Sequence, residues 1–256
     1  MHMLEREREI MCIYGVIVHA ILLHTLICSL ALLLSSYFIY NSVGTIDGAA
    51  VSKLSLVVNL TKHIHVRSQS SREDSGTEYN QFFPHFLWVV RDFTVKLERE
   101  GRKISSRDYL EDALKPEDGV SESTEQKNAV RMLLRNFFPE RDCVTVVRPV
   151  SDEAKLMNLS AVPAEQLRPE FRAQIDSMRK RVLSTARPKT VYGKQLNGAM
   201  LGALAEAYVA AINTGGTPTI STAWDRVVDS QVRICHTVCY FLLSVCSHHV
   251  HLCVCV

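Results

Sequence analysis

The chain has 256 residues, of which 47% are hydrophobic and 22% charged, and its formal net charge is +2. This length suffices for one sizeable domain, and the composition excludes collagen-like proteins, small disulfide scaffolds and strongly disordered chains. The small basic excess also argues against a nucleic-acid polymer as a partner, because such a partner needs its phosphates neutralised.

The charged residues avoid both ends of the chain, since residues 10–46 and 234–256 contain no Asp, Glu, Lys or Arg. Residues 10–34 are long and apolar enough for a membrane-spanning helix, which makes a membrane-anchored interaction protein one hypothesis. A buried strand of a parallel sheet is also a continuous apolar run, and we favour this interpretation for Leu26–Tyr40. Residues 1–25 have no firm assignment.

The uncharged tail, residues 234–256, holds five of the eight cysteines and four of the ten histidines. Cys and His are zinc ligands, but their spacing matches no familiar zinc finger, and a zinc-binding tail is the weaker alternative. We predict no metal site there and leave the tail unassigned. The other cysteines, Cys12, Cys28 and Cys143, have no framework spacing, which favours reduced thiols and the cytoplasm.

Between the two ends, strand and helix patterns alternate. We predict, after a turn at Tyr40–Gly44, a helix at Thr45–Val66, a loop at Ser68–Gln81, a strand at Phe82–Val90, helices at Ser105–Leu114 and Glu125–Phe137, a strand at Cys143–Val147, and helices at Phe171–Val182, Leu196–Ile212 and Thr219–Val232. Ser105-Ser106-Arg107-Asp108 has the pattern of a capping box. This alternation predicts an α/β fold with a mainly parallel sheet.

The sharpest candidate site follows the second predicted strand, where Arg91 and Asp92 come directly after Val89 and Val90. An acidic residue just past a buried strand lies at the carboxyl edge of the sheet, where α/β proteins bind ligands. Its carboxylate can accept hydrogen bonds from N1–H and N2–H2 of guanine, whereas adenine has no donor at N1. The planar guanidinium of Arg91 can lie flat on a base. The alternative is an ordinary strand-end salt bridge or helix cap, which the spacing alone favours.

The segment Leu87-Trp88-Val89-Val90-Arg91-Asp92-Phe93 resembles the guanine-specificity motif of the guanylate-binding proteins, a branch of the dynamin-like large GTPases. That family has Arg-Asp where small GTPases have Asn/Thr-Lys-x-Asp. Further segments resemble the family in the same order along the chain, over roughly residues 27–232: Ile27–Asn41, Leu54–Ile64, Ser106–Glu111, Asn136–Cys143, Leu167–Arg172, Arg187–Lys189 and Thr217–Ile220.

The resemblance implies a partial P-loop GTPase-like domain with a mainly parallel sheet, followed by the start of a helical region. It implies that Asp92 binds the guanine edge and that Arg91 packs on the base. Val146-Val147-Arg148-Pro149 is similar to the family's guanine cap, a loop that covers the base and supports homodimers of GTPase domains, so Arg148 is implied as a base or cap contact. GTP is the implied ligand, accompanied by Mg²⁺ in the intact family.

On this resemblance we expect four segments. They are an unassigned apolar leader at residues 1–26, a partial GTPase domain at 27–213, a linker with the start of a helical domain at 214–233, and an unassigned Cys/His-rich tail at 234–256. The expected compartment is the cytoplasm, with a membrane as the alternative if residues 10–34 form a span.

The phosphate-binding string G-x-x-x-x-G-K-[ST] does not occur in the sequence, because Gly193-Lys194 is followed by Gln195 and lacks the upstream glycine. The switch threonine and the Asp-x-x-Gly metal-binding motif are also missing before Ile27. We therefore predict no catalytic and no metal-ligating residue. The expectation is a partial chain that keeps the guanine-recognition half of a GTPase domain, hydrolyses GTP weakly or not at all, and is poorly soluble alone.

Overall fold

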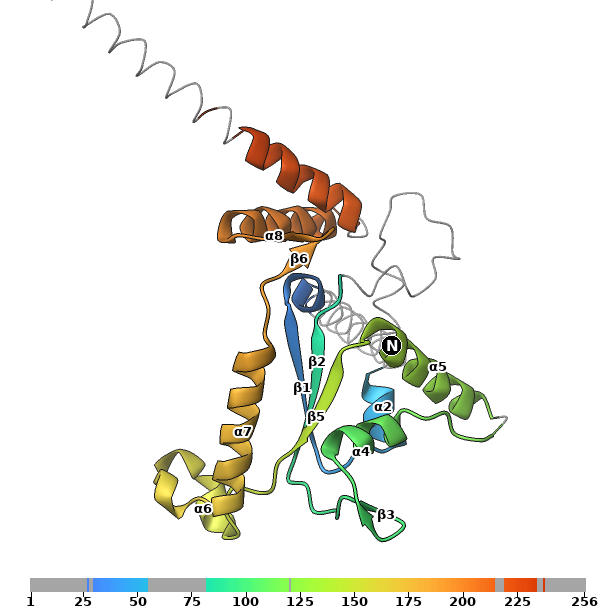
Figure 1. Cartoon of the computed structure of the whole chain (residues 1–256), viewed down its shortest axis with the longest axis vertical. Helices are drawn as coiled ribbons and strands as arrows, with labels where there is room; N and C mark the ends of the chain where they lie inside the picture. The colour runs from blue at the N-terminus through green and yellow to red at the C-terminus, as the bar shows by residue number, and fades with distance from the viewer. Residues whose placement is uncertain are drawn as a thin grey trace, which may run out of the picture.

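The structure, a computed structural model of the chain, describes residues 27, 30–54, 82–119, 121–214, 219–233 and 237 (Figure 1). Three parallel strands form its central sheet in the order β1-β2-β5. They are β1 (Tyr37–Val43), β2 (His85–Arg91) and β5 (Arg141–Thr145). Helices cover both faces of this sheet, which confirms the predicted α/β class with a parallel sheet.

The helices are α2 (Gly48–Lys53), α4 (Ser106–Ala113), α5 (Glu122–Phe137), α6 (Glu153–Met157), α7 (Pro169–Thr185), α8 (Gly198–Asn213) and a helix at residues 220–233. The irregular stretch around α6 also contains two short 3-10 turns, Leu159–Ala161 and Ala164–Gln166. Two small hairpins complete the described part: β3 (Glu98–Arg99) with β4 (Arg102–Lys103), and β6 (Thr190–Val191) with β7 (Lys194–Gln195). α7 lies along one face of the sheet, and α2, α4 and α5 lie along the other (Figure 1).

β2 is the central strand, and the predicted buried strand is confirmed there. Its side chains alternate between two clusters, as a pleated strand requires. Phe86, Trp88 and Val90 point into the main core with α2, α4 and α5, whereas Leu87 and Val89 pack in a smaller cluster under α7. Because both faces of the strand are covered, its sequence is apolar throughout rather than alternating.

Side-chain caps set the residues at which α4 and α5 begin. Ser105 accepts a hydrogen bond from the Asp108 amide, and the Asp108 carboxylate accepts one from the Ser105 amide, so the predicted capping box opens α4. This hydrogen bonding by Ser105 holds the pKa of the Asp108 carboxyl below its usual value. α5 begins three residues earlier than predicted, at Glu122, because Ser121 caps the amide of Thr124.

The strand predicted at Leu26–Tyr40 is wrong in its first part. Residues 30–34 are helical, and Leu32 and Leu33 are buried in the main core. The physical reason is that a leucine and alanine run has high helix propensity, whereas the aromatic and β-branched residues that favour strands begin only at Tyr37. The ambiguity is intrinsic to short apolar runs, which serve equally as a buried helix or a buried strand.

The turn predicted at Tyr40–Gly44 is also wrong, because β1 continues to Val43 and only Gly44 leaves it. Gly44 has φ 92°, the left-handed conformation expected of glycine at that point. The polar pair Asn41 and Ser42 suggested a turn, but both residues pair with β2 in register with Val89 and Val90. Their side chains instead bond to groups on β2, as described below.

Several predictions fall outside the described residues. They include all of residues 1–26, residues 234–256 apart from residue 237, the second half of the Thr45–Val66 helix beyond α2, the Ser68–Gln81 loop and the linker at residues 215–218. The proposed span at residues 10–34 is described only at residue 27 and residues 30–34. Within the described ranges, no helix is both long and apolar enough to cross a membrane.

Lys189 joins three segments at the end of the sheet where the strands begin. Its side chain is only 9% exposed. The ammonium donates to the carbonyl oxygens of Ser35 (3.0 Å) and Phe82 (2.6 Å), which lie two residues before β1 and three residues before β2 respectively. Desolvation by burial lowers the pKa of Lys189 from 10.5 to about 8.

The free energy of unfolding is expected to rise as the pH increases from about 8 to 10.5 on account of Lys189. In that window the unfolded chain still holds the lysine proton and the folded chain has released it, so raising the pH favours the folded state. The contribution is about 1–3 kcal/mol. Urea denaturation of the chain and of Lys189→Met at several pH values gives the free energy of unfolding of each protein as a function of pH. The difference between these two curves measures the contribution of Lys189. Curves that stay parallel between pH 8 and 10.5 would contradict the expectation.

Candidate functional site

The candidate site lies at the carboxyl edge of the sheet, where β2 ends at Arg91 and the chain turns at Asp92 (Figure 1). Backbone hydrogen bonds clamp this turn on both sides. The Gly44 amide donates to the Arg91 carbonyl at 2.8 Å, and the Phe93 amide donates to the Val146 carbonyl at 3.0 Å. The end of β2 is therefore held between the segments that follow its two neighbouring strands.

Asp92 occupies the left-handed region of backbone conformation, with φ 52°. This conformation is costly for most residues, and Asp and Asn are among the few non-glycine residues that tolerate it. Asp92 is partly buried, and no hydrogen bond or ion pair joins its carboxylate to another described residue. Backbone strain of this kind concentrates at functional sites. At this position the Asp92 carboxylate remains available as a hydrogen-bond acceptor at the edge of the sheet.

Arg91 is exposed, and its direction is set by a neighbour on β1. Its Nε donates to Oδ1 of Asn41 at 2.8 Å. Holding Nε fixes the plane of the guanidinium, while Nη1 and Nη2 bond to no described residue. A planar cation held in this way can stack on an aromatic ring. Asn41 was missed by sequence reasoning, because its role depends on the pairing of β1 with β2.

Arg148 follows β5, which is the parallel neighbour of β2, so both lie toward the same edge of the sheet. The side chain of Arg148 is exposed. The backbone around it is fixed from α7, because the Val147 amide donates to Oε1 of Gln174 at 2.8 Å and the Arg168 amide donates to the Pro149 carbonyl at 2.9 Å. The structure thus brings Arg91, Asp92 and Arg148 to one edge, and no hydrogen bond or ion pair joins Arg148 to the other two.

A second layer beneath this edge was not predicted from the sequence. Trp88 donates from Nε1 to the Ser42 hydroxyl at 2.8 Å, and this bond joins β1 to β2 one residue before the end of β1 and three residues before the end of β2. The Thr145 hydroxyl, at the end of β5, lies 3.4 Å from the Ser106 hydroxyl in the first turn of α4. No sequence signal identifies these pairs, because they join residues 39 and 46 positions apart.

For Mg²⁺, the described residues offer no group of three or more His, Cys, Asp or Glu side chains that could hold a metal ion. Mg²⁺ takes carboxylate oxygens together with phosphate oxygens of its nucleotide. Asp92 is a single carboxylate at the predicted base end of the site, which does not fit such a centre. No chemical step is therefore assigned to a metal.

Two family models match consecutive stretches of the chain. The model of the guanylate-binding protein N-terminal domain matches residues 23–191, and that of the guanylate-binding protein C-terminal domain matches residues 192–233. Together they cover the same stretch for which the resemblance was noted in the sequence.

Individual relatives agree with the family models. Guanylate-binding protein 7 of Mus musculus is 40% identical over 200 residues, or 77% of this chain and 31% of the relative. Guanylate-binding protein 6 of Homo sapiens is 41% identical, and guanylate-binding protein 1 of Homo sapiens 37%, again over 77% of this chain and over 32% and 34% of the relative. The chain spans about a third of the length of these curated relatives. On this evidence the chain belongs to the guanylate-binding protein family.

Proposed function

We propose that this chain binds guanine nucleotides, with GTP as the natural ligand, at the carboxyl edge of its sheet. Asp92 accepts hydrogen bonds from N1–H and N2–H2 of guanine, Arg91 packs on the base, and Arg148 contacts the base or covers it. The observation that carries the proposal is the Asp92 carboxylate, held at the sheet edge in a strained turn without a described partner. The relatives' name, guanylate-binding protein, states the same ligand class for them.

The geometry supports a recognition role for this edge. Two fixed hydrogen-bond acceptors on one carboxylate match two donors on guanine, and adenine would leave one acceptor unpaired and bring its own N1 lone pair against the other. A site built to pair with a donor rejects a ligand without that donor, because buried polar groups are then left unsatisfied. Asn41 contributes by positioning Arg91.

We further propose that this chain contributes nucleotide recognition and little or no hydrolysis. The sequence holds no G-x-x-x-x-G-K-[ST] string to cradle the β- and γ-phosphates. The homodimer implied by the resemblance belongs to the proposal too. The loop that carries Arg148 is its expected contact, since Arg148 is exposed there.

The proposal is tested by offering the 256-residue chain guanosine and adenosine nucleotides and measuring binding by ligand-observed NMR, which detects weak complexes. Guanosine di- and triphosphate are expected to bind, and their adenine counterparts about 100-fold more weakly, because two charge-assisted hydrogen bonds are lost. The rate of phosphate release from GTP is expected to be the same in the presence of the chain as in its absence. Equal binding of guanine and adenine nucleotides would contradict the proposed guanine recognition. GTP turnover that Asp92→Asn abolishes would contradict the proposed lack of hydrolysis.

A further inference from the structure

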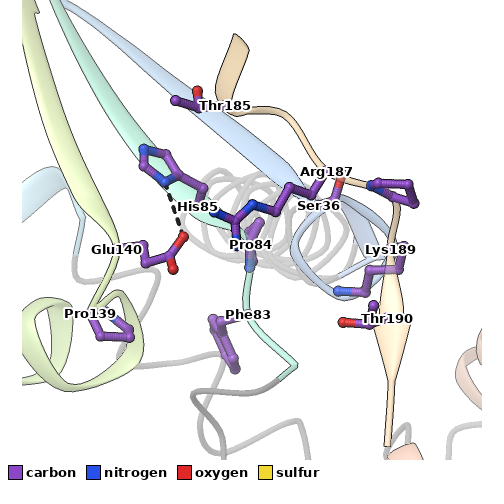
Figure 2. Close-up of a pocket in the computed structure, with 11 residues that line it drawn as sticks. Ser36, Phe83, Pro84, His85, Pro139, Glu140, Thr185, Arg187, Lys189 and Thr190 are labelled. Atoms are coloured by element: carbon purple, nitrogen blue, oxygen red, sulfur yellow. Dashed lines mark ion pairs between the residues drawn. The ribbon is translucent and has the colours of Figure 1, made fainter. Parts of the chain in front are cut away.

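A second polar cavity lies at the opposite end of the sheet, where the strands begin (Figure 2). Its volume is about 220 Å³, and its walls come from the starts of β1 and β2, the turn before β5, and the segment that joins α7 to β6. β2 separates the cavity from the candidate guanine site. His85 and Asp92 are seven residues apart along an extended chain, a distance of about 23 Å.

Cationic groups dominate the charged lining. Arg187 reaches from its segment across the cavity toward His85, and no ion pair joins its guanidinium to a described residue (Figure 2). Lys189 contributes a buried ammonium with two of its three N–H groups engaged by carbonyl oxygens. The one acidic residue, Glu140, already pairs with Nδ1 of His85 at 3.5 Å. Two positive charges therefore face one negative charge, which is shared with an imidazole.

The backbone around the cavity is restricted at several points. Three prolines line it, Pro84, Pro139 and Pro188, and a proline has a fixed φ and little conformational freedom to lose when a ligand binds. The bonds from Lys189 hold one wall to the residues before β1 and β2. Hydroxyl groups of Ser36 and Thr190 add neutral hydrogen-bonding capacity. Convergent polar groups in a small cavity are a feature of small-molecule sites.

We propose that this cavity binds a small oxyanion of the phosphate-monoester class, with Arg187 as its principal ligand. A guanidinium presents parallel N–H groups that match two oxygens of a phosphate. The third N–H of Lys189 and the hydroxyl groups serve the remaining oxygens. The volume is below that of sites for drug-sized molecules, about 300–1,000 Å³, and it limits the ligand to a phosphate carried on a small group. This site goes beyond the proposed nucleotide function and does not depend on it.

The test is a titration of the ¹⁵N-labelled 256-residue chain with inorganic phosphate, without nucleotide, at constant ionic strength set with sodium chloride. Amide shifts are expected to saturate for the residues of the cavity, at Pro84–Phe86 and Arg187–Thr190, where an amide is present. Arg187→Gln is expected to weaken binding about tenfold, through loss of a charge-assisted pair. The matched control is Arg172→Gln, an exposed arginine on α7 outside the cavity, which is expected to bind like the unchanged chain.

Two outcomes would overturn the proposal. One is the absence of saturable shifts in the unchanged chain. The other is equal affinity in Arg187→Gln, with an amide spectrum showing that the variant is folded. Arg187→Lys is the second variant. It keeps the positive charge but lacks the parallel N–H groups of the guanidinium, and it is expected to bind phosphate with intermediate affinity. Because no nucleotide is present, a negative result here leaves guanine recognition untouched, and a failure of guanine recognition leaves this titration interpretable.

Discussion

Replacing Asp92 by asparagine is expected to change the base preference of the chain from guanine to xanthine. A carboxylate offers two acceptors, which suit the N1–H and N2–H2 donors of guanine. A carboxamide offers one acceptor and one donor, which suit the N1–H and O2 groups of xanthine. We expect guanosine diphosphate to bind about 100-fold more weakly to Asp92→Asn, because the carboxamide no longer makes charge-assisted hydrogen bonds to both donors of guanine. We expect xanthosine diphosphate to bind more tightly to the variant than to the unchanged chain.

The substitution is well suited to the site because asparagine also tolerates the left-handed conformation that Asp92 adopts at φ 52°. The turn should therefore persist, and the change in preference reports on hydrogen bonding rather than on folding. Asp118→Asn is the matched control, since Asp118 is an exposed acid in the loop before α5. It is expected to keep the preference of the unchanged chain. If Asp92→Asn lost affinity for guanosine diphosphate and for xanthosine diphosphate to the same extent, the result would count against base recognition by this carboxylate.

Replacing Trp88 by alanine is expected to destabilise the chain by about 3–5 kcal/mol. Trp88 is fully buried in the central strand. Its ring packs edge-on against Tyr40 and Phe86, at centroid distances of 5.2 and 6.1 Å, and its Nε1 donates to the Ser42 hydroxyl. The substitution removes the largest side chain of the core and leaves a cavity that rigid neighbouring strands cannot close.

Urea denaturation followed by circular dichroism measures this loss, with two comparison variants. Trp88→Phe keeps most of the ring contacts and loses the hydrogen bond to Ser42, so about 1–2 kcal/mol is expected. Trp224→Ala removes the other tryptophan, which is partly exposed in the helix at residues 220–233, and a smaller loss than for Trp88→Ala follows from its lower burial. Equal losses at the two tryptophans would contradict the assignment of Trp88 to the core.

Where a local signal specified an element, the sequence was sufficient to find it. The capping box at Ser105 marked the start of α4, and the apolar run at Phe82–Val90 located the central strand. The run at residues 30–34 misled because its leucines can be buried in either conformation. Asn41 and Ser42 misled because turn-forming residues also occur in a strand when its neighbour supplies partners for their side chains.

The same distinction applies to the candidate site. Asp92 and Arg91 could be singled out because they are adjacent in the sequence and follow a recognisable strand. The left-handed backbone conformation of Asp92 could not be predicted, because no glycine and no turn pattern in the sequence indicates it. Its conformation follows from the bonds that clamp it to the segments after β1 and β5. Gln174 and Asn41 likewise gain their roles from contacts across 27 and 50 positions.

The sequence by itself determined the α/β class, most of the helices, the central strand and the family to which the chain belongs, because periodicity, caps and short motifs act over a few residues. Only the tertiary structure decided where β1 begins and ends, how Asp92 is turned and held, which residue positions Arg91, and that a cationic cavity forms at the far end of the sheet. These features depend on strand register and on packing between distant segments, and no local pattern encodes either one.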